Sequence, residues 1–441
     1  MILILTKPPP VLKRILFCLF LVALPVVSLH AQLVVGAQIR PRAEFRNGFK
    51  TLPGEGRSPA FFIEQRSRLF ADYNSEDFQV RINFQDVRIW GSTSQVYKTD
   101  ENTLTNVYEA WGLYRASPHW SFKFGRMELD YDNARFLGNL DWAAQGRSHD
   151  ALLVSYTSDS ADLRIDIGGA YNQQGFEPAM LAETFYFGVN NYKTMQFIWA
   201  HKEFSRATFS ALIHNDGRQV PSDSSLALRQ TYALIGSGSL GALDIGGEFY
   251  YQGGKNAIGR EVSAYLLSGY ATFKTAVTPL TLGFDYLSGT SIADEKDRSF
   301  DPLYGTNHKF YGYMDYFYVG NPHGQVGNIA GLLDVHVKTK FKTGAKSSLL
   351  AHAHYFRSAA DLYNPADGNL ADSRYLGTEL DLVFNAKLAA YVDITLGYSQ
   401  MLAGESMELV KATPGDHTAF NNWAWFMINF NPVIFQHAAQ K

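Results

Sequence analysis

Cysteine is almost absent from this sequence, which has one cysteine among 441 residues. That residue, Cys18, lies in an N-terminal apolar run and follows bulky Phe17 rather than a small residue, so we do not expect it to be lipid-modified. Three basic residues precede the run and Ala31 follows it, which predicts an export signal over residues 1–31. The mature chain would then have no cysteine, and disulfides are excluded.

The sequence also has no excess of basic residues. The chain has 39 basic and 42 acidic residues, and removing the predicted signal leaves 36 against 42, a net charge of −6. We therefore do not expect nucleic acid as a partner. No segment after the signal is apolar enough to span a bilayer as a helix, and the run inside the signal is short and interrupted by Pro25.

Compact catalytic motifs are lacking as well. The sequence has no nucleophile elbow and no H-E-x-x-H zinc motif, so we expect no enzyme and no cofactor. His352 and His354 lie on one face of a predicted strand, which is half of a metal site. No third ligand is evident, and we therefore interpret them as pore-lining histidines and predict no metal.

Strand-like segments are abundant, and long and short connections alternate between them. Eighteen candidate strands follow the signal; every second connection has three to five residues, and the others have about 10 to 42. This alternation is typical of outer-membrane β-barrels. We predict an all-β fold, a single transmembrane antiparallel β-barrel over residues 32–441 with short periplasmic turns and long extracellular loops. The strands are predicted at about 33–45, 62–73, 78–90, 106–115, 120–129, 150–157, 163–167, 192–201, 206–214, 227–236, 243–249, 262–274, 279–288, 331–341, 347–356, 376–384, 392–398 and 421–430.

The third predicted strand has the clearest pattern. Residues 78–85 read Phe-Gln-Val-Arg-Ile-Asn-Phe-Gln, so apolar and polar side chains alternate with the two-residue period of a strand. In a soluble sandwich or propeller the apolar face would form the core, whereas in a barrel of this size it faces lipid. Strand lengths near the ~9–11 residues that cross a bilayer favour the membrane barrel. Eighteen strands also lie in the porin range, wide enough for an aqueous channel.

Arginines concentrate on the predicted inward face of the first strands. They are Arg40, Arg42, Arg66, Arg68, Arg81 and, past a predicted register change, Arg88, with Glu44, Glu64 and Glu109 among them. A guanidinium is permanently charged and fits a carboxylate, so such a ladder would pass an anionic chain from site to site. Alternatively, these arginines and glutamates pair across the wall and stiffen the barrel. Both interpretations stay open, and both can apply at different heights.

The segment 124–150 is dense in glycine and charged residues, among them Arg126, Arg135 and Arg147. It is too broken to extend a strand, so we expect it to fold over or into the pore. If Lys123 faces water, Arg126 faces lipid, at a cost of roughly 2–4 kcal/mol at mid-bilayer. We therefore predict a bulge at Gly125 that turns Arg126 inward.

The longest predicted loop runs from residue 289 to about 330. It contains the run Asp-Pro-Leu-Tyr-Gly-Thr-Asn-His-Lys-Phe at 301–310 and an aromatic cluster at 311–318. Loops of this length usually carry function or are disordered. The aromatics favour an ordered lid with rings that stack on sugars, and a packed loop that only shields the rim is the alternative. The candidate loop residues are Asp301, Tyr304, His308 and Lys309.

Four segments carry a family resemblance: 125–150, Gly-Phe-Asp-Tyr-Leu-Ser-Gly at 283–289, 300–310, and Met-Asp-Tyr-Phe at 314–317. In these segments the chain resembles the alginate-export family of outer-membrane barrels. The resemblance implies an 18-strand porin that secretes the polyuronate alginate through an arginine-lined pore. It also implies a pore role for Arg66, Arg68, Arg126 and Arg147.

Together these observations predict a passive channel of the bacterial outer membrane for anionic saccharides or similar solutes. The expected partners are outer-membrane lipid, an anionic saccharide or small solute, and the barrel-assembly machinery during biogenesis. Three alternatives remain: a receptor or adhesion barrel closed by its loops, a general porin without saccharide preference, and an enzyme acting at the barrel rim.

Overall fold

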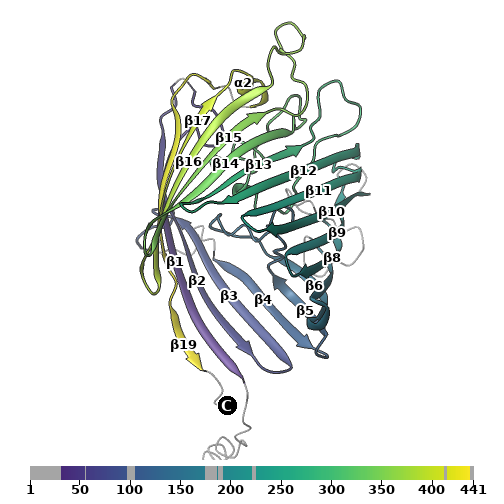
Figure 1. The fold of residues 1–441 in the computed structure, drawn as a ribbon, viewed down its shortest axis with the longest axis vertical. Coiled ribbons are helices and arrows are strands. Elements are labelled where there is room, and N and C mark those ends of the chain that lie inside the picture. Colours follow the sequence, from purple (N-terminus) through teal and green to yellow (C-terminus); the bar gives the residue numbers. More distant parts are fainter. Residues whose placement is uncertain are drawn as a thin grey trace, which may run out of the picture.

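The computed structural model describes residues 31–54, 56–96, 105–173, 186, 192–220, 225–411 and 415–437. The predicted export signal, apart from Ala31, lies outside the described residues. The strands from β1 (Gln32–Asn47) to β18 (Asn421–Phe430) form one antiparallel sheet in which each strand pairs with the next along the chain, and β18 pairs back to β1. The sheet is therefore a closed barrel, as predicted (Figure 1).

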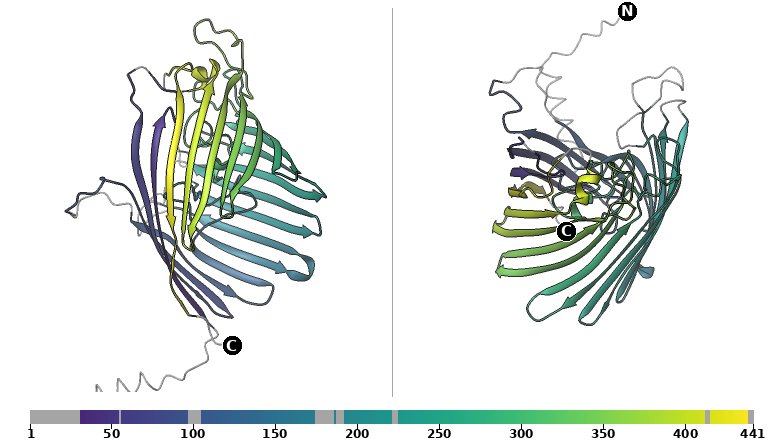
Figure 2. Two further views of the ribbon diagram at one scale, coloured as in Figure 1. Left: turned by 60° about the vertical axis from the view of Figure 1, so that its left-hand side comes forward. Right: turned by 90° about the horizontal axis from the view of Figure 1, so that it is seen from above.

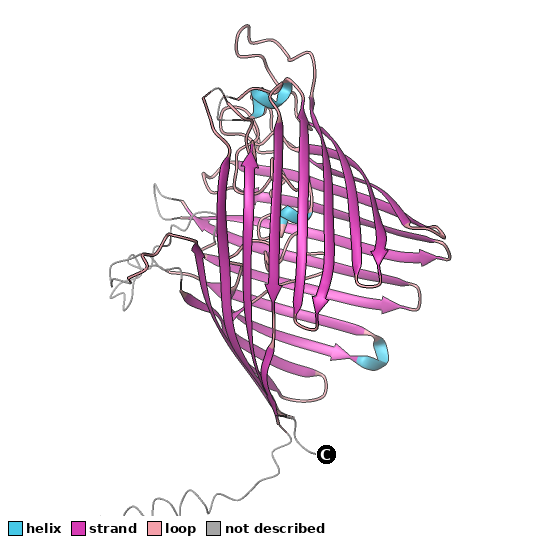
Figure 3. Cartoon of the chain, turned by 90° about the vertical axis from the view of Figure 1, so that its left-hand side faces the viewer, coloured by secondary structure: helices cyan, strands magenta, loops and turns pink. Residues whose placement is uncertain are grey.

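Every predicted strand is present, and several extend further than the sequence pattern indicated. The strands are β1 (Gln32–Asn47), β2 (Ala60–Asn74), β3 (Phe78–Ile89), β4 (Asn106–Arg115), β5 (Trp120–Met127), β6 (His149–Ser158), β7 (Leu163–Tyr171), β8 (Thr194–Phe204), β9 (Ala207–Gln219), β10 (Leu226–Leu240), β11 (Leu243–Lys255), β12 (Glu261–Lys274), β13 (Pro279–Leu287), β14 (Leu332–Gly344), β15 (Ser347–Arg357), β16 (Tyr375–Ala389), β17 (Val392–Ala403), β18 (Asn421–Phe430) and β19 (Val433–His437). Short helical segments are η1 (Asp159–Ala161), η3 (Asn307–Lys309) and α2 (Ser406–Val410). The long loops gather at one end and the short turns at the other (Figure 3).

The barrel seam contains a strand that the sequence pattern did not predict. β18 ends at Phe430 as expected, but after Pro432 the chain resumes as β19, which pairs with the first residues of β1. Proline has no N–H to donate, so it interrupts the ladder. Its carbonyl still accepts a hydrogen bond from the Ala37 N–H at 3.1 Å. β18 and β19 together therefore close the barrel along the whole length of β1.

The two faces of the sheet have opposite character. On β3, Ile82 and Phe84 point outward and are exposed, whereas Asn83 and Gln85 point into the barrel and are buried. Exposed apolar side chains on the outside and buried polar ones on the inside reverse the order of a soluble protein and match a lipid-facing wall. Among the described residues, no helix is long and apolar enough to cross a membrane.

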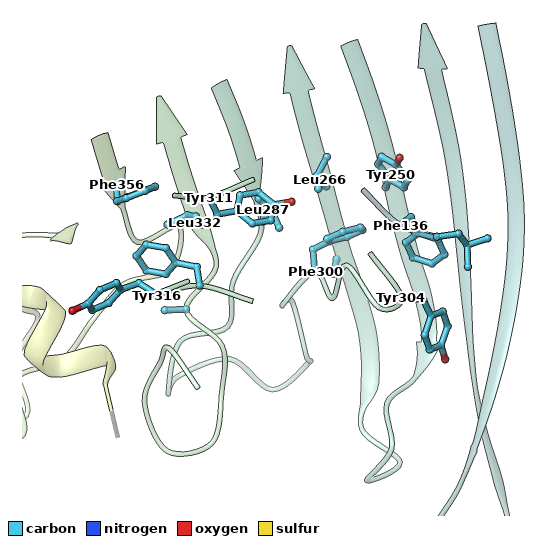
Figure 4. Packing of buried hydrophobic residues seen from close by; sticks show 14 of the residues in the cluster. Phe136, Tyr250, Leu266, Leu287, Phe300, Tyr304, Tyr311, Tyr316, Leu332 and Phe356 are labelled. Atoms are coloured by element: carbon cyan, nitrogen blue, oxygen red, sulfur yellow. The ribbon is translucent and has the colours of Figure 1, made fainter. Parts of the chain in front are cut away.

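Two long loops fold into the barrel interior, namely 128–148 between β5 and β6 and 288–331 between β13 and β14 (Figure 2). They join through a parallel bridge between Leu137 and Tyr304, where the Gly138 N–H donates to the Tyr304 carbonyl at 2.9 Å. Their aromatic side chains pack on inward-facing strand residues and form a buried apolar core inside the barrel (Figure 4). The expectation that both loops enter or cover the pore is thus confirmed.

Candidate functional site

Two neighbouring strands place three arginines together on the lumenal wall. Arg40 on β1 lies directly opposite Arg66 on β2, and Arg68 follows two residues later on the same face. Like charges directly opposite each other on a sheet destabilise it. An anion placed between the guanidinium groups would offset this repulsion.

Asp141, from the inserted loop 128–148, supplies that anion. Its carboxylate lies 2.8 Å from Arg66, 3.3 Å from Arg40 and 3.7 Å from Arg68. The three arginine side chains are at most 8% exposed, whereas the Asp141 side chain is 52% exposed. Three guanidiniums thus surround one solvent-accessible carboxylate and leave an excess of positive charge. We call Arg40, Arg66, Arg68 and Asp141 the arginine cluster.

Neighbouring groups hold the arginine cluster in position. Gln38 Oε1 accepts hydrogen bonds from Arg66 Nε and Nη2 at 2.9 and 2.7 Å. The Arg68 guanidinium lies 3.6 Å from the centre of the Tyr108 ring, an attractive cation–π contact. Burial alone would raise the pKa of Asp141, but the positive charges of Arg66 and Arg40 outweigh it and lower that pKa below its usual value. Asp141 therefore stays ionised.

Two other lumenal arginines are each paired with two carboxylates. Arg42 contacts both Glu44, at 2.9 Å, and Glu64. Nearer the short-turn rim, Arg81 lies 2.6 Å from Glu109 and 2.9 Å from Asp72. These pairs correspond to the stiffening interpretation, whereas the arginine cluster has the excess charge that the ladder interpretation requires.

Arg88 lies on the outer face rather than in the lumen, contrary to the prediction. The β2–β3 pairing keeps one register throughout. The β3–β4 ladder does shift between Asn83 and Phe84, but its extra residue, Tyr108, lies in β4, so the alternation along β3 is unchanged. Arg88 therefore shares the outward face of Phe84, and Asp86 neutralises it at 2.5 Å.

Arg126 also lies on the outer face, because the predicted bulge at Gly125 does not form. Gly125 does adopt a positive φ of 114°, and a Cβ there would lie 2.3 Å from the Ala110 carbonyl oxygen, but both neighbouring ladders keep their register. Asp150, its partner across the β5–β6 ladder, pairs with Arg126 at 2.9 Å. Arg126 is the penultimate residue of its strand, and a charge near the membrane interface costs only about 0–1 kcal/mol.

Arg135 anchors the loop 128–148 to the wall instead of facing the channel. It is buried between Glu248 at 3.1 Å and Asp285 at 2.9 Å, and it donates to the Tyr311 hydroxyl at 3.0 Å. Arg147 donates to the Gly305 carbonyl at 3.0 Å and so ties this loop to 288–331. Burial lowers the pKa of Arg147. Both arginines therefore position the loops.

The candidate residues of the loop 288–331 have similar packing roles. Asp301 pairs with Arg229 at 2.9 Å, and Tyr304 is buried with its hydroxyl 3.3 Å from Asp216. His308 pairs with Asp315 at 2.6 Å, and exposed Lys309 donates to the Asn133 carbonyl at 2.8 Å.

The aromatic rings of the same loop are not free to stack on sugars. Tyr311, Tyr316 and Phe317 are almost fully buried in the core that the loops form inside the barrel. The interpretation of these rings as a sugar-stacking lid is therefore wrong for these three residues, and the packed-loop alternative describes them.

A basic pocket at the short-turn rim was not predicted. It has a volume of about 600 Å³, and its lining includes Lys340, Lys342, Lys346 and Lys387. Lys340 and Lys342 have the same strand parity as His336, which lies on the lumenal face. The alternation of the β14 segment contained this signal, because residues 338, 340 and 342 are all lysine.

A closed barrel with an apolar outer face and a charged interior narrowed by two loops defines an outer-membrane channel. Solved structures of Pseudomonas aeruginosa proteins share this fold. The outer membrane protein OpdK is 11% identical with a TM-score of 0.60, covering 92% of this chain and 99% of that one. OccD3 (OpdP) is 12% identical with a TM-score of 0.60, covering 91% and 92%. OccK8 (OprE) is 11% identical with a TM-score of 0.60, covering 91% and 98%.

The family follows from the sequence itself. The profile described as "Alginate export" matches residues 31–418, so this chain belongs to the alginate-export family. No curated protein matches the chain. The family and the barrel together place the protein in the bacterial outer membrane as a channel.

Proposed function

We propose that the barrel passes anionic saccharides, or similar carboxylate-bearing solutes, and that the arginine cluster is its selective constriction. The observation that carries this proposal is the convergence of Arg40, Arg66 and Arg68 on the single carboxylate of Asp141. Guanidinium groups form the strongest protein hydrogen bonds to carboxylates, because both partners are charged. The family description, alginate export, fits a uronate as the solute.

In this proposal Asp141 occupies the position of a passing carboxylate. Its side chain is the accessible member of the arginine cluster, so a uronate group of the solute competes with it for the same guanidiniums. Conduction requires binding strong enough to enter the site and weak enough to leave it. An internal carboxylate that competes with the solute weakens binding and so permits release.

The basic pocket at the short-turn rim supports the same proposal. Lys340, Lys342 and Lys346 place positive charge at the periplasmic mouth. A mouth of one sign of charge raises the local concentration of oppositely charged solutes. An anionic chain would therefore meet lysines before it reaches the arginine cluster.

We propose that transport proceeds without a chemical step. A serine, a histidine and an acid do meet in the lumen, but Ser210 lies between the other two, 2.7 Å from His201 and 2.5 Å from Asp132. A hydrolase triad needs the histidine in the middle, where it can accept the serine proton. This arrangement therefore lacks the geometry of a nucleophile.

A second candidate function is a receptor barrel closed by its loops. The buried core that the loops 128–148 and 288–331 form inside the barrel favours it. A closed barrel would give no conductance in a planar bilayer, whereas the channel proposal predicts open-channel current.

For biogenesis we propose cleavage after residue 31, a single barrel domain over 32–441, and insertion by the barrel-assembly machinery. Phe435 is an aromatic residue of β19, the strand that pairs with the start of β1.

The proposed function is tested by current block. Oligouronates added to single channels should interrupt the current, and neutral oligosaccharides of equal length should do so at much higher concentration. Equal block by both would leave a general porin without saccharide preference.

A further inference from the structure

Three histidines come together on the lumenal wall, away from the arginine cluster. His336 on β14 lies directly opposite His354 on β15, and His352 precedes His354 by two residues on the same face. The ring centres of His352 and His354 are 3.8 Å apart, and that of His336 is 5.2 Å from His352 and 5.6 Å from His354. One nitrogen from each ring falls within 4.8 Å of the other two.

Hydrogen bonding leaves the lone pairs of these rings available. His354 Nδ1 lies 2.8 Å from Asp334, which orients the ring and leaves its Nε2 as the free ligand atom. That Nε2 and both nitrogens of His352 are buried without a hydrogen-bond partner. His354 is 3% exposed and His352 is 7% exposed, so each is more than nine-tenths buried. Buried polar groups normally have a hydrogen-bond partner, so three buried nitrogens without one indicate a position for a bound ligand.

We propose that His336, His352 and His354 bind a divalent transition-metal ion of the zinc, copper or nickel class. Imidazole nitrogens suit these ions, and three protein ligands leave a further coordination position open. The contact between Asp334 and His354 is the carboxylate–histidine pair that commonly supports a metal ligand. Asp334 is therefore a positioning residue for the site.

The charges around the histidines favour a cation. Asp334, Asp381 and Glu379 are buried on the same lumenal face, and one Asp381 oxygen lies 3.6 Å from His354 Nε2. Lys338, opposite His352 in the ladder, is the neighbouring positive charge. The carboxylates outnumber it, so a divalent ion would be partly neutralised in this position. The proposal shares no residue with the arginine cluster and does not depend on anion transport.

The test uses the purified full-length barrel in detergent, titrated with Zn²⁺ by calorimetry and loaded with Cu²⁺ for electron paramagnetic resonance. We expect one Zn²⁺ per barrel in this site and a Cu²⁺ spectrum with hyperfine coupling to three imidazole nitrogens. His352→Gln combined with His354→Gln should remove the site, and Asp334→Asn should weaken it roughly 10–100-fold. His214→Gln removes another buried lumenal histidine and should leave binding unchanged.

The electrophoretic mobility of unheated and heated samples is compared to verify that each variant still forms a barrel. Undiminished stoichiometry in the double histidine variant would overturn the proposal. So would a wild-type Cu²⁺ spectrum with coupling to fewer than three imidazoles, which needs no variant to fold.

Discussion

The Arg66 guanidinium and the Asp141 carboxylate lie 2.8 Å apart, one on the barrel wall and the other on a loop inserted into the lumen. The same loop also meets Arg40 and Arg42 through the Trp142 carbonyl, at 3.3 and 2.8 Å. The loop therefore contributes the one carboxylate of the arginine cluster and holds it against the wall. A solute that carries carboxylates must compete with this internal contact.

Replacing Asp141 with asparagine should strengthen the interaction with uronates. The change removes the competing charge and leaves three guanidiniums for the solute. A hydrogen bond to a charged group contributes about 1.5–3 kcal/mol, so we expect oligouronate block at roughly tenfold lower concentration. Single-channel recording measures this concentration. Asp150→Asn, which removes a carboxylate from the outer face, is the matched control and should behave like wild type; no gain in Asp141→Asn would contradict the competition.

Replacing Arg66 and Arg68 with alanine should lower anion preference. Two of the three positive charges of the arginine cluster are lost, and oligouronate block should need at least tenfold higher concentration. Arg88→Ala removes the same kind of charge from the outer face and serves as control. If the double variant and Arg88→Ala had the same selectivity as wild type, the cluster would not be the selective constriction.

The strands could be predicted because their physical cause is local. Lipid outside and water inside impose a two-residue period, and residues 78–85 follow it without a break. The alternation of short and long connections then predicted that the long loops lie at one end of the barrel and the short turns at the other. β19 was missed because Pro432 interrupts the pattern, although pairing with β1 resumes directly after it.

The orientation of Arg126 was mispredicted for an energetic reason. Parity placed it outward, and we set parity aside because of the cost of an arginine at mid-bilayer. That cost does not apply near the strand end, where Asp150 pairs with it. The contact between Asp141 and the wall joins residues some 75 to 100 positions apart, and no periodicity encodes it. His336 lies opposite His354 because a bulge between Lys342 and Gly344 shifts the β14–β15 register. Counting equally outward from the turn would have placed another residue opposite it.

Replacing Arg135 with alanine should release the loops from the wall. The variant leaves Glu248 and Asp285 buried without their partner, and breaking a buried ion pair costs about 3–5 kcal/mol. We expect faster hydrogen exchange in 128–148 and a larger single-channel conductance. Arg57→Ala removes an exposed guanidinium from the β1–β2 loop and is the control. Unchanged exchange in Arg135→Ala would contradict the anchoring role.

Lys411 should make the stability of the extracellular loops depend on pH. Burial against Tyr316 and Phe317 lowers the pKa of its ammonium to about 7, from 10.5 in the unfolded chain. Between these values the unfolded chain binds more protons, so stability rises with pH by about 1.4 kcal/mol per unit. Below pH 7 the full penalty applies.

Lys411→Met removes that titration. The midpoint of loop unfolding, followed by limited proteolysis on heating, should be higher in the variant than in wild type at pH 6. The difference should shrink toward pH 10, and a difference independent of pH would contradict the assignment.

The central claim is that the excess positive charge of the arginine cluster selects anions. The reversal potential of the purified barrel in a planar bilayer under a potassium chloride gradient measures this selection directly. We predict a potential of the sign given by anion preference, moving toward zero in the Arg66→Ala, Arg68→Ala double variant. A potential of the opposite sign in the wild-type barrel, or a barrel that carries no current, would contradict the account.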